Sequence, residues 1–173
     1  ACMDIVGIYV PLGHAIGRLG CLLGGCCAGK MTDLPWGVSY PPGAPTYWRQ
    51  VNAGLIERNV LVDTYPVHPV QAYELIGLLL SYIFLRFLFT RKKHDGLVSV
   101  FYFICYGFVR FVVEFFRGDV LRPVFGLFTA SQTFALLWLV AGTTTLLVLK
   151  MTIWRDKPFD ATDTGQNERM SPE

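Results

Sequence analysis

Residues 97–116 read LVSVFYFICYGFVRFVVEFF, and this stretch decides the fold class. A helix of about 20 residues, at a rise of about 1.5 Å per residue, crosses the hydrocarbon core of a bilayer. The stretch lacks the alternation of polar and apolar residues that a transmembrane barrel strand requires. A helix also satisfies its own backbone hydrogen bonds inside hydrocarbon. We therefore predict that these residues cross a membrane as an α-helix.

Three further apolar stretches of similar length cover approximately residues 5–23, 70–89 and 130–149. Hydrophobic residues make up 53% of the 173-residue chain and charged residues only 16%, whereas soluble domains carry about 25% charged residues. The mean hydropathy is +0.42. The sequence thus predicts an all-α, polytopic membrane protein with four transmembrane helices in one domain, residues 1–154. No soluble globular fold fits this composition.

The segments outside these helices predict how the chain is oriented. Residues 30–66 are rich in Pro, Gly, Tyr and Trp, which indicates an ordered, turn-rich arm at the level of the lipid headgroups. Basic residues occur at 91–93 and again at positions 150, 155 and 157. Because short basic loops stay in the cytoplasm, we predict a cytoplasmic C-terminus, with the arm and the 118–128 turn on the outer face. The polar tail, residues 155–173, is predicted to be disordered.

Four polar residues recur at helical spacing along the third apolar stretch, namely Tyr106, Arg110, Glu114 and Arg117. An arginine deep in a bilayer costs at least about 2.5 to 3.5 kcal/mol, so Arg110 needs a partner, and Glu114 lies one turn away. An ionisable residue inside a membrane indicates a functional site by default, with a structural ion pair as the alternative. Arg117 lies near the helix end, where extension to the lipid headgroups is an equal alternative.

The first apolar stretch repeats this design with His14, Arg18, Cys21 and Gly25 on one helical face. Glycines at positions 13, 17, 20, 24 and 29 predict close packing between helices. Cys21, Cys26 and Cys27 have a spacing that matches neither a zinc motif nor a secreted disulfide framework. We interpret these cysteines as small, buried, unpaired residues, and we predict no metal site.

Two short motifs mark helix starts. Residues 68–71 read His-Pro-Val-Gln, and a proline is tolerated in the first turn of the helix that follows. His68 is interpreted as a structural residue of this helix entry, because one ring nitrogen can satisfy local backbone groups. Residues 129–132 have the spacing of a capping box, which gives Gln132 a structural explanation.

Buried arginines that accompany a carboxylate and tyrosines predict the binding of a phosphate-bearing lipid. Guanidinium groups bind phosphate oxygens bidentately, and this attraction strengthens away from water. Preplaced donors also stabilise the negative charge that develops when a phosphate leaves. We therefore expect an anionic phospholipid as the ligand, and we expect neither a cofactor nor a nucleic acid.

Four motifs follow one another over nearly the whole chain before the tail, namely Gly17-Arg18-Leu19-Gly20, Pro35-Trp36, residues 68–74 and residues 106–117. In these motifs the sequence resembles the prolipoprotein diacylglyceryl transferases of bacteria. The resemblance implies an inner-membrane enzyme that moves a diacylglyceryl group from phosphatidylglycerol to the lipobox cysteine of a prolipoprotein peptide. The products are a thioether and glycerol phosphate.

The resemblance also implies roles for individual residues. Arg18 and Arg110 hold the lipid phosphate, and Glu114 and Tyr106 complete the catalytic set. Further residues contribute to substrate binding, namely Arg117, Gly17, Gly20, His68, Gln71 and Glu74. The nucleophile is the cysteine of the substrate, so no cysteine of this chain needs that role.

The sequence departs from the family pattern at three points. The family has seven membrane helices and the four predicted here match its last four, so we expect its His-Gly-Gly motif, which carries the usual proton acceptor, to lie outside this chain. Cys21 replaces the asparagine of the family signature, and Cys26 stands where a glutamate is usual. Residues 24–29 read GGCCAG, a version associated with divergent members.

Two functions therefore stand as alternatives. In the first, the chain is part of a transferase or is a divergent transferase in which His14 is the base. In the second, it is a non-catalytic lipid-binding relative that serves as an accessory or scaffold subunit of a larger membrane complex. The start at Ala1 indicates a fragment, a processed product or a numbering that begins inside a longer protein. We expect the chain alone to bind phosphatidylglycerol without transferring diacylglyceryl groups, because the thiol proton needs an acceptor.

Overall fold

The computed structural model describes residues 2–92, 95–118 and 129–153, and every regular element within them is a helix. The helices are α1 Cys2–Gly24, α2 Pro45–Asn52, α3 Val70–Arg91, α4 Leu97–Glu114 and α5 Ala130–Ile153. In this part of the chain the β pairing is limited to isolated bridges. All helices except the short α2 are long and apolar enough to cross a membrane. The protein is an all-α, multi-pass membrane protein, as the sequence predicts.

The predicted helix boundaries agree closely with the structure. α3, α4 and α5 begin at residues 70, 97 and 130, as expected, whereas α1 already begins at Cys2. α4 ends at Glu114 because the next three N–H groups bond to carbonyls only three residues back, a tightening common at helix ends. The predicted turn beyond Gly118 and the predicted disordered tail lie outside the described residues.

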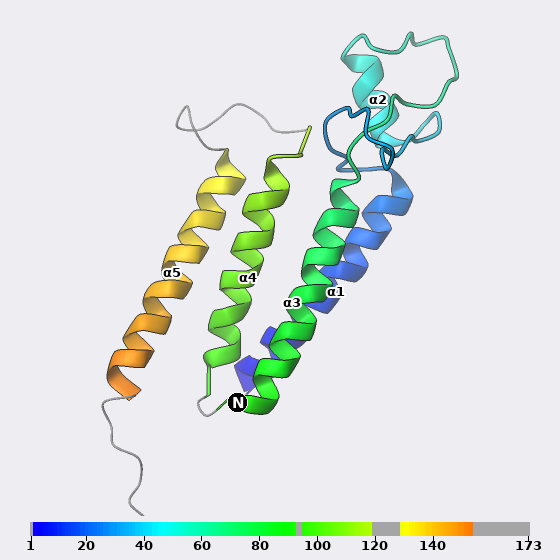
Figure 1. Cartoon of the computed structure of the whole chain (residues 1–173). Coiled ribbons are helices and arrows are strands. Elements are labelled where there is room, and N and C mark those ends of the chain that lie inside the picture. The colour runs from blue at the N-terminus through cyan, green and yellow to red at the C-terminus, as the bar shows by residue number, and fades with distance from the viewer. Residues whose placement is uncertain (1, 93–94, 119–128, 154–173) are drawn as a thin grey trace, which may run out of the picture.

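Figure 1 shows α1 and α3 side by side, α4 next to this pair, and α5 on the far side of α4. The contact between α4 and α5 is close, since a Cβ atom on Gly107 would lie 3.0 Å from the carbonyl oxygen of Ala135. Large apolar side chains are exposed along the outward faces of the long helices. In a membrane these faces meet lipid instead of water.

A buried carboxylate joins three helices at one end of the bundle. Asp4 of α1 is fully buried, and it accepts hydrogen bonds from the backbone N–H groups of Gly96 at 2.8 Å and Ser99 at 3.2 Å. The Ser99 hydroxyl lies 3.3 Å from the same carboxylate, and the Lys92 ammonium pairs with it. The charge thus satisfies free N–H groups at the positive end of the α4 dipole. We call Asp4, Lys92, Gly96 and Ser99 the Asp4 cluster.

The predicted arm, residues 30–66, folds at the opposite end of the bundle and contains α2 (Figure 1). The sequence reasoning missed α2, although Pro45 at its first position is a helix-start signal. The Gln50 amide bonds in both directions to the backbone of Tyr65, at 2.9 and 3.1 Å. Tyr47, Val51 and Ile56 form a small core beneath these bonds. The arm is therefore ordered by its own contacts, and its place on the outer face stays a prediction.

The glycines of α1 do not pack as predicted. A Cβ atom would meet nothing within 4 Å, among the described residues, at positions 13, 17, 20 and 24. Gly29, which follows α1, does pack closely as predicted, since a Cβ atom there would lie 2.5 Å from the Phe116 carbonyl oxygen. The close contacts between the helices themselves use other glycines. A Cβ atom on Gly7 would lie 3.2 Å from the Ser99 backbone, and one on Gly77 would lie 2.8 Å from Val109. The spacing of the glycines predicts that they share one face of α1, but it does not predict whether a neighbouring helix covers that face.

Candidate functional site

Arginine and glutamate side chains from three helices meet toward the end of the bundle that carries the arm. Arg18 of α1 places Nη2 2.9 Å from Oε1 of Glu74 on α3. Arg110 of α4 approaches the other oxygen of this carboxylate, with Nη1 3.6 Å from Oε2. The two arginines that were expected to converge on one phosphate thus converge on one buried carboxylate.

Glu114 extends this set of ion pairs along α4. Its Oε2 lies 3.2 Å from Arg110 Nη2 and 3.7 Å from Arg117 Nε. The predicted pairing of Arg110 with Glu114 is confirmed by the first distance. The second favours a polar contact for Arg117 over extension to the lipid headgroups. We call Arg18, Glu74, Arg110, Glu114 and Arg117 the arginine network.

The arginine network is buried but incompletely hydrogen-bonded. The side chains of Glu74 and Glu114 are 2% and 3% exposed, and that of Arg110 is 16% exposed. Among the described residues, Glu74 Oε2, Arg110 Nη1 and Glu114 Oε2 have no hydrogen-bond partner. A buried polar atom without a partner is costly to a fold. Buried donors and acceptors that are not fully hydrogen-bonded suit the binding of an anion.

The start of α5 closes one side of the network. Thr129 and Gln132 form the predicted capping box, in which each backbone N–H donates to the other side chain, at 3.1 and 3.2 Å. The Thr129 hydroxyl also donates to Glu114 Oε1 at 3.0 Å, and Arg110 Nη2 donates to Ser131 Oγ at 3.2 Å. The sequence identified these residues only as a helix cap. Their contact with the network depends on how α5 packs on α4, which local spacing does not reveal.

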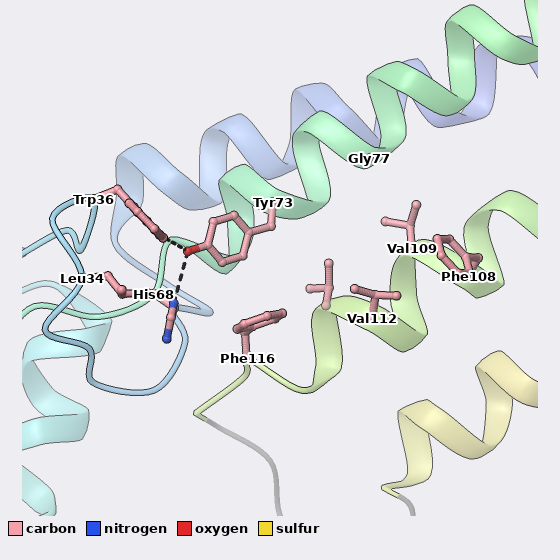
Figure 2. A pocket seen from close by; sticks show the side chains of 10 residues that line it. Leu34, Trp36, His68, Tyr73, Gly77, Phe108, Val109, Val112 and Phe116 are labelled. Atoms are coloured by element: carbon pink, nitrogen blue, oxygen red, sulfur yellow. Dashed lines mark hydrogen bonds between the residues drawn. The ribbon is translucent and has the colours of Figure 1, made fainter.

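An apolar cavity of about 470 Å³ lies between α3, α4 and the arm (Figure 2). The same helical turns carry the arginine network, because Tyr73 adjoins Glu74 on α3 and Val109 adjoins Arg110 on α4. The other lining residues are Leu34, Trp36, His68, Gly77, Phe108, Val112, Val113 and Phe116. The cavity and the arginine network thus lie at the same level of α3 and α4, although none of the described network residues lines the cavity.

Polar groups gather at the arm side of this cavity, where Figure 2 shows Trp36, Tyr73 and His68 in contact. Trp36 Nε1 donates to the Tyr73 hydroxyl at 2.8 Å, and this oxygen lies 3.2 Å from His68 Nδ1. The Phe116 ring packs against both His68 and Tyr73, at centroid distances of 5.3 and 5.6 Å. His68 therefore lines the cavity in addition to beginning α3. Trp36 and Tyr73, which the sequence placed in motifs without a site role, belong to the same wall.

Two predicted site residues of α1 and α4 contact each other beside the network. Tyr106 lies one turn before Arg110, and its ring packs against that of His14 at a centroid distance of 5.5 Å. His14 is exposed and lies one turn before Arg18. Gly17 and Gly20 flank Arg18 on α1, with open space beside them.

Gln71 serves the loop after α1 and not the network. It is buried, and its amide donates to the Cys26 carbonyl and, at 3.3 Å, to the Tyr40 hydroxyl. Burial raises the pKa of the Tyr40 hydroxyl, so this group keeps its proton. Gln71 thus connects the start of α3 to the chain that leaves α1.

The three cysteines that follow Arg18 come together in space. The sulfur atoms of Cys21, Cys26 and Cys27 all lie within 4.8 Å of one another. All three are free thiols, but they are half-buried, whereas the sequence predicted small, buried, unpaired residues. Burial raises the pKa of the Cys26 thiol to about 11, and the neighbouring thiols act in the same direction. We call these residues the thiol cluster.

Comparison with known proteins bears on the same segments. The family model described as "Prolipoprotein diacylglyceryl transferase" matches residues 1–148. A phosphatidylglycerol–prolipoprotein diacylglyceryl transferase of Clostridium tetani is 34% identical over 140 residues, which cover 81% of this chain and 50% of that protein. The proteins of the same name from Burkholderia cenocepacia and Stenotrophomonas maltophilia are 37% and 32% identical, over 66% and 81% of this chain and 42% and 46% of their own lengths. The chain spans about half the length of the curated relatives it matches.

Proposed function

The chain belongs to the prolipoprotein diacylglyceryl transferase family, and from this premise we propose that its arginine network binds the phosphate of phosphatidylglycerol for diacylglyceryl transfer. The names of the relatives specify this lipid and a prolipoprotein acceptor. One observation carries the proposal: Arg110 Nη1 is buried and has no hydrogen-bond partner among the described residues. A phosphate oxygen would supply that partner.

The cavity between α3 and α4 supports the choice of a lipid over a free phosphate. It is lined almost entirely by apolar side chains, and the turns that form it also carry Glu74 and Arg110. We propose that one acyl chain of phosphatidylglycerol enters this cavity while the phosphate reaches the arginines. Tyr73 and His68 then offer polar groups to the ester region of the lipid.

The proposed reaction forms one carbon–sulfur bond and breaks one carbon–oxygen bond. The thiolate of the acceptor cysteine attacks the glycerol carbon that carries the phosphate, and glycerol phosphate leaves with the bonding electrons. Arg18 and Arg110 stabilise the charge that grows on the departing phosphate, a contribution commonly worth 10²- to 10³-fold in rate. The thiol proton passes to a base, and His14 is the candidate in this chain because it lies one turn from Arg18.

The lipid-binding part of this proposal is tested with the purified chain in detergent, by native mass spectrometry with phosphatidylglycerol and with phosphatidylethanolamine. We expect at least tenfold tighter binding of phosphatidylglycerol. Arg18→Gln and Arg110→Gln should each weaken it at least tenfold, about 1.4 kcal/mol. Arg86→Gln is the matched control, because Arg86 is exposed on α3 away from the network. Equal binding of the two lipids, or equal losses in the control, would overturn the proposal.

The transfer step is tested with membranes that contain the native gene product, labelled phosphatidylglycerol and a lipobox peptide. Thioether product that falls at least 100-fold in Arg110→Gln supports the transferase. Arginine-dependent lipid binding in membranes that form no product would favour the accessory-subunit alternative instead. Loss of product in His14→Ala, with lipid binding retained, would support His14 as the base.

We also propose that the protein lies in the bacterial inner membrane, with the arm outside and the C-terminus in the cytoplasm. The basic residues after α3 and the start of α1 lie at one end of the bundle, since Lys92 pairs with Asp4, and the arm lies at the other end. A cysteine introduced at position 58, in the arm, should react in intact cells with a membrane-impermeant reagent. A cysteine at position 93 should not, and labelling there from outside would reverse the orientation.

A further inference from the structure

We propose that Cys21, Cys26 and Cys27 form a binding site for a single thiophilic metal ion, a site that the proposed lipid chemistry does not use. Their sulfur atoms lie within 4.8 Å of one another. A metal ion held at about 2.3 Å from three sulfurs requires them to be about 4 Å apart. The cluster therefore needs to contract by less than about 1 Å to reach ligand geometry.

The backbone turn at the end of α1 explains why the first two thiols meet. Gly25 has a positive φ of 67°, its N–H bonds to the Leu22 carbonyl at 3.4 Å, and the Cys26 N–H bonds to the Cys21 carbonyl at 3.2 Å. This is the bonding pattern of a Schellman motif, which reverses the chain directly after a helix. Cys26 is thereby folded back over the last turn of α1, beside Cys21.

Cys27 joins this pair through an uncommon backbone conformation. Its φ is 57°, and it is the one non-glycine residue with positive φ in the described part of the chain. Such a conformation costs a β-substituted residue free energy and persists where the surroundings fix it. Here it turns the chain so that the third sulfur reaches the other two.

Contacts from α2 and α3 hold the loop in place around the sulfurs. The Thr46 hydroxyl donates to the Gly25 carbonyl at 2.7 Å, and the Gln71 amide donates to the Cys26 carbonyl. The Arg49 guanidinium donates to the carbonyls of Ala28 and Gly29 at 2.7 and 2.8 Å. A loop fixed from two helices presents its side chains without the entropy cost of ordering them on binding.

The donor set decides the class of ion. Among the described residues it consists of three sulfurs, without a carboxylate or imidazole. Soft thiolate ligands select ions such as Cu⁺ and Zn²⁺ over Mg²⁺ or Ca²⁺. All three residues are half-buried, so an ion can still enter from solvent. Binding displaces the thiol protons to solvent and joins the end of α1 to the loop. The ion would then brace α1 one turn beyond Arg18.

The test uses the purified chain, kept reduced by a phosphine, stripped with EDTA and titrated with Cd²⁺. Thiolate-to-cadmium charge-transfer absorbance should saturate at one ion per chain, and the thermal midpoint should rise. Cys27→Ser should weaken Cd²⁺ binding at least tenfold. Cys105→Ser, which removes a free cysteine of α4, should leave it unchanged. Absence of the absorbance, or equal losses in the two variants, would overturn the proposal.

A second measurement avoids variants and so does not depend on their folding. Wild-type chain is alkylated with N-ethylmaleimide with and without Cd²⁺, and modified cysteines are counted by mass spectrometry. Cd²⁺ should slow the modification of Cys21, Cys26 and Cys27 at least tenfold and leave Cys105 unaffected. Uniform protection, no protection, or a disulfide within the cluster of the reduced protein would contradict the site.

Discussion

The two ends of the helix bundle each bury carboxylates against basic groups, yet they satisfy them differently. Asp4 receives hydrogen bonds from two backbone N–H groups and a lysine, with a hydroxyl close by. Glu74 and Glu114 lie among three arginines, but each keeps one oxygen without a hydrogen bond in the described residues. The hydrogen bonds of the Asp4 carboxylate are therefore complete, whereas those of the two network carboxylates are not.

This difference distinguishes a structural ion cluster from the proposed binding site. A buried charge that serves the fold is best satisfied completely, because every missing hydrogen bond costs stability. A site for an anion must keep donors available until the anion arrives. Loose pairing at Glu74 and Arg110 is therefore what the proposed phosphate site requires, whereas the dense pairing at Asp4 suits a helix junction.

Among the substitutions predicted here, removal of the Asp4 carboxylate should have the largest effect. It should lower stability without changing lipid binding. Asp4→Ala leaves the N–H groups of Gly96 and Ser99 and the Lys92 ammonium without their shared acceptor. We expect a loss of about 2 to 3 kcal/mol, measured by thermal unfolding in detergent. Phosphatidylglycerol affinity of the folded fraction should stay within about twofold. Asp63→Ala is the control, because Asp63 is exposed in the arm at the opposite end of the bundle. A large loss of lipid affinity in Asp4→Ala would end the distinction between the two ends.

Neutralisation of Glu74 should act on lipid binding as well as on stability. Glu74→Gln removes the charge that competes with phosphate for Arg18 and Arg110, and it preserves side-chain size. We expect phosphatidylglycerol to bind about fivefold more tightly, equivalent to about 1 kcal/mol, while the thermal midpoint without lipid falls because the two arginines lose their shared counter-charge. The measurement is the native mass spectrometry titration. Weaker binding would mean that Glu74 orients the arginines more than it competes with the lipid.

The members of the arginine network could be predicted from sequence, but their partners only in part. Helical spacing placed Arg110 one turn from Glu114, and the structure confirms that pair. The sharing of Glu74 between Arg18 and Arg110 depends on the packing of three helices. No local pattern carries that information. The Asp4 cluster went unpredicted for the same reason, because the partners of Asp4 lie 88 to 95 residues further along the chain.

The sequence also predicted long helices better than short or bent segments. The apolar segments predict where α3, α4 and α5 begin, because a membrane-spanning helix needs a long and continuous apolar segment. α2 is short and of mixed polarity. Its packing within the arm therefore stabilises the helix more than its composition does. The thiol cluster was missed because it needs positive φ angles at Gly25 and Cys27, which a spacing rule for metal ligands does not include.

Filling the apolar cavity should have a smaller effect and one that depends on the lipid tail. Val112 lines the cavity and is 39% exposed, so Val112→Trp can occupy part of the space without disturbing the core. We expect about threefold weaker binding of long-chain phosphatidylglycerol, about 0.7 kcal/mol. Glycerophosphoglycerol, which lacks acyl chains, should compete as well as before. Leu80→Trp, at an exposed position of α3 outside the cavity, is the control. Equal losses for the lipid and the headgroup would place the acyl chain elsewhere.

The smallest effect on stability is expected at a glycine beside the arginine network, where α1 has open space. A Cβ atom on Gly17 meets nothing within 4 Å in the described chain, whereas one on Gly7, near the Asp4 cluster, lies 3.2 Å from the Ser99 backbone. Gly17→Ala should therefore change the free energy of unfolding by less than about 0.5 kcal/mol, or raise it slightly, because alanine favours helix.

Gly7→Ala is the matched comparison for Gly17→Ala within the same helix. It adds the same methyl group, but here against backbone atoms of Ser99 that cannot rotate away. It should cost about 1 kcal/mol or more through overpacking. Thermal unfolding of both variants in the same detergent measures the contrast, and lipid titration of Gly17→Ala adds the functional reading. Unchanged stability with weaker phosphatidylglycerol binding would support the substrate role predicted for Gly17. A stability loss equal to that of Gly7→Ala would instead mean that the glycine face of α1 packs against a part of the protein outside the described residues.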